Sequence, residues 1–282
     1  MDTVYGFDAF TPREIAQRVT DLGVAKTRLP LLSVVMLGML AGAFIGLGAL
    51  FNVIVLSDAS MAFAARRVLG GVLFSLGLFL VLVAGAELFT GNNLLAMAWA
   101  DGKVSTRDVL LNWAVVCAAN FAGALVLAGL VFFSGHADLE GGAVGRTYVS
   151  VASAKMSLPP VRAFFSGVMC NVLVCMAVWV AMAGRSVVDK LAAILLPIAA
   201  FVAAGFEHSV ANMYLIPLAL MLQAAAGQPV EVAGLFRNLV PVIAGNLVGG
   251  SVIVALVYHV IYVRPRLHQH AAPLARAHER PP

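Results

Sequence analysis

Residues 205–213, GFEHSVANM, place four polar or ionisable side chains between two long apolar stretches. They are Glu207, His208, Ser209 and Asn212. Ionisable side chains are costly inside hydrocarbon, so their presence there indicates a functional site. An imidazole with an unperturbed pKa of about 6.5 can also exchange a proton near neutral pH. The stretch therefore predicts a polar centre within an apolar protein.

A second polar stretch, AELFTGNN at residues 86–93, interrupts another apolar run. A carboxylate beside a helix break can accept hydrogen bonds from freed backbone N–H groups and fix the loop. Alternatively it could contact a solute directly, although an anionic carboxylate would repel an anionic solute. Both roles are open for Glu87 and Glu207.

A single histidine in an apolar setting is commonly a hydrogen-bonded core residue. His208 differs because it falls inside the interruption of a long apolar segment, between Gly205 and Ser209. This context favours a role in a pore. In the other interruption, the hydroxyl of Thr90 could face it.

Catalytic and metal chemistry find little support in the sequence. His208 and Ser209 could suggest an intramembrane hydrolase, but no G-x-S-x-G or H-E-x-x-H motif is present. Besides His208, the apolar segments contain only His259, near the end of the last one. The cysteines all lie in apolar runs and are expected to be buried thiols: Cys117, Cys170 and Cys175. No catalytic residue, metal ligand or cofactor is predicted.

The composition indicates an integral membrane protein. Of the 282 residues, 61% are hydrophobic and 11% are charged, whereas about 25% of the residues of a soluble domain are charged. A helix needs about 20 mostly apolar residues to cross a bilayer. The sequence predicts six such segments: residues 30–56, 68–100, 109–133, 161–183, 190–223 and 239–263. The net charge of +4 lies in loops and tails, which indicates orientation rather than nucleic-acid binding.

Three regions are predicted along the chain. Residues 1–29 are expected to be cytoplasmic and to form an amphipathic helix at the membrane surface, since Ile15 and Val19 recur at helical spacing between charges. Residues 30–263 are expected to form the six-helix pore domain. Residues 264–282, rich in Pro, Arg and His, are expected to be a disordered cytoplasmic tail.

The basic residues predict the orientation. An even number of crossings places both termini on one side, and that side receives most of the Lys and Arg residues. Such a bias is typical of cytoplasmic segments. The pair Arg66–Arg67 falls on the opposite side and runs against this bias.

The two interrupted segments are the second and the fifth of the six, which indicates an internal repeat. The sequence around Asn120 aligns with that around Asn246, each with a glycine three residues later, and Glu87 falls opposite Glu207. Each half has an odd number of crossings, so the second half must be inverted in the membrane. Inverted repeats with broken helices at matching positions are typical of a transport site.

Four stretches together resemble the formate/nitrite transporter family: AELFTGNNLLAMAWADGKVS, CNVLVCMAVWVAMAGRSVVDK, GFEHSVANM and GNLVGG. The resemblance extends from about residue 12 to residue 263. It implies an all-α membrane protein with an aquaporin-like fold, in which six transmembrane helices form two inverted three-helix repeats and the second and fifth helices are broken. It also implies a homopentamer, surrounded by lipid in the bacterial cytoplasmic membrane, with a pore for a small monovalent anion in each protomer.

The resemblance further implies roles for individual residues. His208 would be the central histidine, on the loop that faces the one with Thr90. The apolar constrictions would be formed by Phe74, Leu78, Leu88, Phe89, Val174 and Phe201. Asn171 and Asn246 would be polar pore residues, and Lys155 would draw anions toward the pore. Without the resemblance, the apolar residues would be expected in the core or facing lipid.

The most specific function predicted is formate transport with proton exchange at His208. An apolar constriction excludes a bare anion because the hydration that it removes is not replaced, and a proton shared with His208 would lower the charge in transit. Nitrite or hydrosulfide in the same pore is an alternative, as is a pore for neutral solutes. A membrane-embedded enzyme and a structural or sensory membrane protein are the alternatives from other classes, but broken helices in inverted repeats favour transport.

Overall fold

The computed structural model describes residues 9–264, in which every regular element is a helix and no strand occurs. The elements in chain order are α1 (Pro12–Thr27), α2 (Leu31–Ser57), α3 (Phe63–Leu80), η1 (Val81–Gly85), η2 (Gly91–Leu94), α4 (Leu95–Ala100), α5 (Thr106–Phe133), η3 (His136–Asp138), α6 (Leu139–Met156), α7 (Pro160–Ala181), α8 (Val187–Ala204), α9 (Ser209–Ala225), α10 (Val232–Leu247), η4 (Val248–Leu256) and η5 (His259–Val263). Elements η1, η4 and η5 are π-helical, whereas η2 and η3 are 3₁₀-helical. Except for Arg264, the predicted disordered tail lies outside the described residues.

Six helices of the described chain are long and apolar enough to cross a membrane. They span Leu31–Ser57, Phe63–Gly85, Thr106–Phe133, Pro160–Ala181, Val187–Ala204 and Val232–Val263. Each overlaps one of the six predicted segments. The second segment is completed after its break by η2 and α4, and the fifth by α9. The predicted six-helix architecture with broken second and fifth helices is therefore confirmed.

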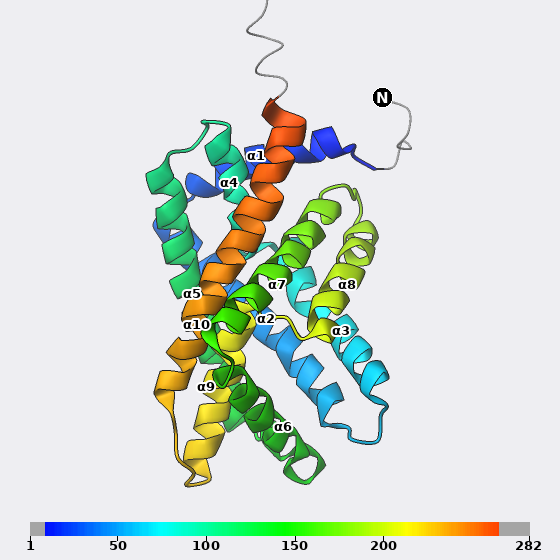
Figure 1. The fold of residues 1–282 in the computed structure, drawn as a ribbon, viewed down its shortest axis with the longest axis vertical. Helices are drawn as coiled ribbons and strands as arrows, with labels where there is room; N and C mark the ends of the chain where they lie inside the picture. The colour runs from blue at the N-terminus through cyan, green and yellow to red at the C-terminus, as the bar shows by residue number, and fades with distance from the viewer. Residues whose placement is uncertain (1–8, 265–282) are drawn as a thin grey trace, which may run out of the picture.

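The two halves repeat the same packing. In the first half, α2 packs against α3 and α5; in the second, α7 packs against α8 and α10. A helix outside the six spans precedes each half, and Figure 1 shows α1 across one end of the molecule and α6 at the other. This is the inverted, aquaporin-like arrangement expected from the sequence. The helix α6 itself was not predicted.

The helix α1 starts with a capping box. The Glu14 N–H donates to the Thr11 hydroxyl (3.3 Å) and the Thr11 N–H donates to the Glu14 carboxylate (2.7 Å), which also keeps the pKa of Glu14 below its ordinary value. Ile15 and Val19 are buried, and α1 packs on α4 and η5, whereas Leu22 is 40% exposed. The apolar face of α1 thus covers protein. Its position at a membrane surface stays a prediction.

Glycines allow the helices of each half to approach closely. A Cβ on Gly123 of α5 would collide with the carbonyl oxygen of Met39 on α2, and a Cβ on Gly249 of η4 would collide with that of Val168 on α7. The two contacts are equivalent in the internal repeat. Small residues at such crossings are the usual means of helix packing in membranes.

We expect Gly123→Ala to lower the free energy of unfolding by about 1–3 kcal/mol, because the methyl group must push α2 and α5 apart. Gly129, on the same helix, is the matched control, because an added Cβ there meets no atom within 4 Å. Gly129→Ala should change the stability by less than about 1 kcal/mol. Thermal unfolding in detergent measures both. Equal midpoints for the two variants would contradict the role of this crossing.

Candidate functional site

Each broken helix ends in a glycine with left-handed backbone. Gly85 ends η1 with φ 82°, and Gly205 follows α8 with φ 79°. Glycine adopts this conformation without the steric penalty of a Cβ. After these residues the chain is extended, at Ala86 in the first half and at His208 in the second. The two interruptions thereby bring Thr90 and His208 together.

His208 and Thr90 form a buried polar pair. The Nε2 atom of His208 lies 3.0 Å from the Thr90 hydroxyl, and the two side chains are 3% and 0% exposed. The Nδ1 atom accepts a hydrogen bond from the backbone N–H of Ala211 (3.1 Å), so His208 caps the N-terminus of α9. Since Nδ1 is an acceptor, the neutral ring carries its proton on Nε2 and donates it to Thr90.

Aromatic rings surround this pair on one side. Phe201 stacks on His208 with ring centroids 5.8 Å apart, and Phe74 meets Phe201 edge-on at 5.6 Å. Phe74 also meets His208 edge-on at 6.5 Å. The three rings come from α3, α8 and the loop before α9. One side of His208 is therefore covered by apolar rings.

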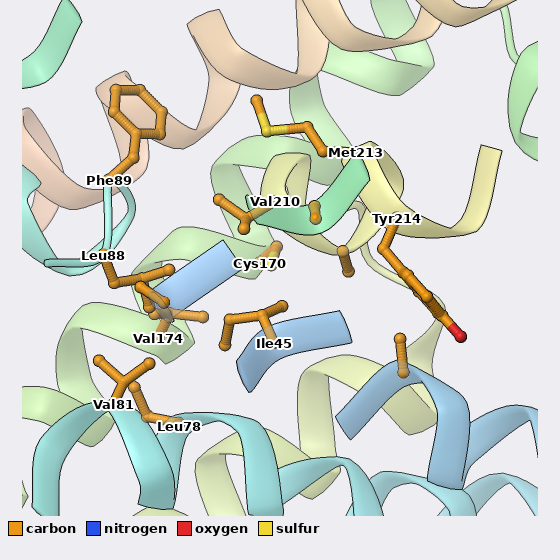
Figure 2. Packing of buried hydrophobic residues seen from close by; sticks show 14 of the residues in the cluster. Ile45, Leu78, Val81, Leu88, Phe89, Cys170, Val174, Val210, Met213 and Tyr214 are labelled. Atoms are coloured by element: carbon orange, nitrogen blue, oxygen red, sulfur yellow. The ribbon is translucent and has the colours of Figure 1, made fainter. Parts of the chain in front are cut away.

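Aliphatic side chains lie near the other side of the loop that carries Thr90. Leu78 and Leu88 line a cavity of about 60 Å³ that also contains Lys26. Figure 2 shows that the neighbouring side chains of Leu88 and Phe89 leave the loop in opposite directions, with Leu88 on the side of Leu78. Val174 is buried in the same core cluster. Of the predicted constriction residues, Phe89 is thus the one whose side chain points away from Leu78 and Leu88.

A buried ion pair lies beside the second break. Lys155 of α6 contacts Glu207 with an Nζ–Oε1 distance of 2.8 Å, and the side chains are 17% and 4% exposed. The other carboxylate oxygen accepts hydrogen bonds from Asn212 (2.7 Å) and Asn238 (3.2 Å). A buried carboxylate requires both a counter-ion and hydrogen bonds. Glu207 has both, so its charge is compensated.

The first break has the equivalent cluster. Lys26 of α1 contacts Glu87 at 2.7 Å, and Asn92 donates to the other carboxylate oxygen at 2.6 Å. The same Asn92 amide donates to Asn112 at 3.0 Å. One lysine thus enters from each end of the molecule, Lys26 from α1 and Lys155 from α6.

Two equivalent asparagines hold the backbone of the breaks. Asn120 accepts from the Phe89 N–H (2.9 Å) and donates to the carbonyls of Gly38 (2.7 Å) and Glu87 (2.8 Å). Asn246 accepts from the Ser209 N–H (3.0 Å) and donates to the carbonyls of Gly167 (2.8 Å) and Glu207 (3.1 Å). Each amide therefore ties one loop to the neighbouring helix of its half. The two asparagines are those aligned by the sequence repeat.

Asn171 links the two halves. Its amide donates to the carbonyl of Thr90 (3.2 Å), to the side chain of Asn93 (2.7 Å) and to the carbonyl of Asn246 (2.7 Å). The side chain is fully buried. Asn171 therefore contacts the backbone carbonyl of Thr90, whereas His208 contacts the hydroxyl of the same residue.

In the two lysine–glutamate clusters, sequence reasoning gave no individual site role to five residues: Lys26, Asn92, Asn112, Asn212 and Asn238. One signal was available, because each glutamate is followed by an asparagine five residues later, at Asn92 and at Asn212. Lys26 offered none, since it lies 61 residues from Glu87 in the sequence.

We expect Glu207→Gln to lower the free energy of unfolding by about 3–5 kcal/mol, because Lys155 then lacks its counter-ion in a buried site. The double variant Lys155→Met/Glu207→Gln removes both charges and should lose less than Glu207→Gln alone. Thermal unfolding of Glu207→Gln, Lys155→Met and the double variant completes the double-mutant cycle. A double loss equal to the sum of the single losses would show that the two side chains are not coupled.

The geometry defines a class of protein. Two broken helices in inverted repeats meet at a buried polar centre between apolar side chains, as in membrane transport proteins. The family model for the formate/nitrite transporters matches residues 13–260. The chain belongs to the formate/nitrite transporter family. It is therefore a membrane protein that transports small anions, and not an enzyme.

Individual relatives agree with this assignment. The chain is 38% identical over 256 residues to the "Uncharacterized transporter YrhG" of Bacillus subtilis, covering 89% of this chain and 93% of YrhG. It is 34% identical over 278 residues to the "Formate channel FocA" of Escherichia coli K12, covering 93% of this chain and 98% of FocA.

Solved structures show the same fold. A "Pentameric formate channel with formate bound" has a TM-score of 0.76 and 34% identity, covering 83% of this chain and 98% of that one. An "FNT family ion channel" has a TM-score of 0.78 and 31% identity, covering 87% and 97%.

Proposed function

We propose that this protein is a formate channel in which His208 exchanges a proton with the permeating anion. The observation that carries the proposal is the buried pair of His208 and Thr90, with aromatic rings on one side and leucines on the other. The family assignment supports anion transport, and relatives with 34–35% identity are named formate channels. Formate is therefore preferred over nitrite and hydrosulfide.

The pair is suited to a small carboxylate. The neutral ring of His208 presents an Nε2–H, and Thr90 presents a hydroxyl, so both donors can turn to the oxygens of one anion. Phe74 and Phe201 exclude water from the same space. A bare anion loses hydration there without full replacement, which makes a reduction of its charge favourable.

Proton exchange has a structural requirement at Nδ1. In the proposed cycle, His208 takes a proton from solution at Nδ1 and gives up the hydrogen bond from Ala211. The imidazolium attracts formate, and the Nε2 proton then moves to a carboxylate oxygen. This leaves formic acid, which crosses the apolar rings at lower cost than the anion, and a neutral ring that carries its proton on Nδ1. Loss of that proton and uptake of one at Nε2 then restore the starting tautomer and the hydrogen bond from Ala211. One proton accompanies each formate.

The neighbouring residues have supporting roles in this proposal. Glu87 and Glu207 hold the two loops through the asparagine amides and the lysines. Lys26 and Lys155 lie toward the two ends of the path, and because each is paired with a glutamate, it attracts an anion only at short range. The polar pore residues Asn171 and Asn246 orient the loop backbone next to the site. The apolar gates comprise Phe74, Leu78, Leu88, Val174 and Phe201, without Phe89, which points away from Leu78.

Assembly and location complete the proposal. The relative with formate bound is pentameric, and each protomer here contains a complete His208–Thr90 pair, so we assign a pentamer with one pore in each protomer. The chain would lie among the lipids of the bacterial inner membrane. The described chain starts and ends at the α1 end, where α1 contacts η5, and the excess of basic residues assigns that end to the cytoplasm.

We expect His208→Asn to reduce formate uptake into proteoliposomes by about 100-fold, the lower end of what proton transfer from a positioned side chain contributes. Uptake is measured at external pH values between about 5 and 8, the range in which a histidine titrates. The wild-type rate should depend on pH beyond the change in free formic acid, and the rate of the variant should not. Protein-free liposomes give the leak of formic acid through lipid.

His136→Asn is the matched control, because this histidine lies in η3, away from the breaks. It should transport formate with the wild-type pH profile. Nitrite uptake, run in parallel, tests the substrate. Faster nitrite than formate uptake would exclude formate as the preferred anion, and an unchanged pH profile in His208→Asn would exclude proton exchange at this residue.

A further inference from the structure

Arg67 is a cation on the first turns of α3, at the end of the molecule opposite α1. Figure 1 shows the loop between α2 and α3 at the same end as α6. The Nε atom of Arg67 donates to the carbonyl of Ala203 (2.9 Å), and Nη2 donates to that of Val202 (2.8 Å). These carbonyls belong to the last turn of α8, which ends at Ala204. The guanidinium therefore caps the C-terminus of the broken helix.

This helix end lies next to the aromatic gate. Phe201 directly precedes Val202, and its ring stacks on His208 at 5.8 Å. A helix C-terminus carries the equivalent of about −0.5 elementary charge. Without compensation, that partial charge would oppose an anion at the gate. A full positive charge on Arg67 reverses its sign.

Arg67 is also aligned with the gate along α3. Arg67, Gly71, Phe74 and Leu78 are spaced by four, three and four residues and so lie on one face of the helix. An added Cβ on Gly71 would lie 2.6 Å from the carbonyl oxygen of Ala199, which shows that this face packs on α8. Arg67 is the residue of this face nearest the α6 end.

The charge of Arg67 is not cancelled by a carboxylate. Lys26 and Lys155 each form an ion pair with a buried glutamate. Arg67 is half-buried and forms no ion pair among the described residues. The guanidinium has five N–H donors, of which the two carbonyls use two. The others can meet water or an anion.

The internal repeat has this cap in one half only. Gly85 matches Gly205, an offset of 120 residues (205 − 85), so the counterpart of Arg67 is residue 187 (67 + 120), a valine exposed at the start of α8. Within residues 9–264, no arginine or lysine bonds to the carbonyls of η1. The two broken helices thus end differently.

We propose that Arg67 determines the affinity for anions at the α6 end of the pore, by reversing the charge of the C-terminus of α8 beside the Phe74–Phe201 gate. The proposal rests on the proposed anion transport but not on formate as the substrate. Any small monovalent anion entering from this end experiences the same field. Entry from the α1 end does not depend on it.

The test is the KM for uptake from each face of proteoliposomes, with formate and nitrite as separate probes. Proteolysis of an N-terminal tag on one side assigns the α1 face. We expect Arg67→Met to raise the KM at the α6 face about three- to ten-fold, the range that a charge at a helix end supports. The maximal rate at that face and the KM at the α1 face should stay within about two-fold of wild type.

Arg66→Met is the matched control, because Arg66 is the adjacent residue but, among the described residues, its side chain hydrogen-bonds only to the carbonyls of Leu56 and Asp58, both at 3.4 Å. It should leave both KM values unchanged. Arg67→Lys keeps the charge without the two-pronged contact and should stay close to wild type. In about 1 M of an impermeant salt, where the Debye length is about 3 Å, wild type and Arg67→Met should converge.

Other outcomes would overturn the proposal. A lower maximal rate with unchanged KM at both salt concentrations, together with a lower melting temperature, would mean that Arg67 only stabilises the end of α8. An unchanged KM would mean that its field does not reach the anion. Uptake of nitrite without formate would reject formate while still testing Arg67. Uptake of neither anion would overturn both proposals.

Discussion

A helix that breaks inside a membrane exposes backbone groups that hydrocarbon cannot satisfy. This protein solves the problem twice with a single asparagine in each half. Asn120 and Asn246 each receive a loop N–H and return two hydrogen bonds to carbonyls. An unsatisfied group of this kind would cost several kcal/mol. The two breaks, and all that lies between them, depend on these amides.

The scaffold is symmetric, but the chemistry is not. The offset of 120 residues that relates Gly85 to Gly205 also relates Leu88 (88 + 120) to His208 and Thr90 (90 + 120) to residue 210, a valine. The histidine thus occupies the position that the buried Leu88 occupies in the other half. One repeat supplies an apolar closure and the other a titratable ring, on loops of the same shape.

The sequence predicts well what depends on local composition. Runs of apolar residues locate the six crossings, and polar interruptions locate the two breaks, because both signals lie within a single segment. It fails for α6, because a window that searches for apolar crossings passes over a helix that is not one of the six spans and contains Gly141, Gly142, Arg146 and Lys155. It also fails for Lys26, since the partner of a buried charge is decided by tertiary packing rather than by sequence distance.

Arg67 shows why counting charges is not enough. The sequence makes it an exception to the positive-inside bias, but the bias concerns how many basic residues a segment carries, not what each one contacts. The lysine–glutamate pairs are neutral as units, so their field falls off quickly with distance and favours an anion only nearby. A cation bound to carbonyls keeps its full charge, because its partners are dipoles. The fold therefore holds compensated charges beside both breaks and an uncompensated one beside Phe74 and Phe201 only, so in the proposed pore a nearly symmetric scaffold would give an anion two different entrances.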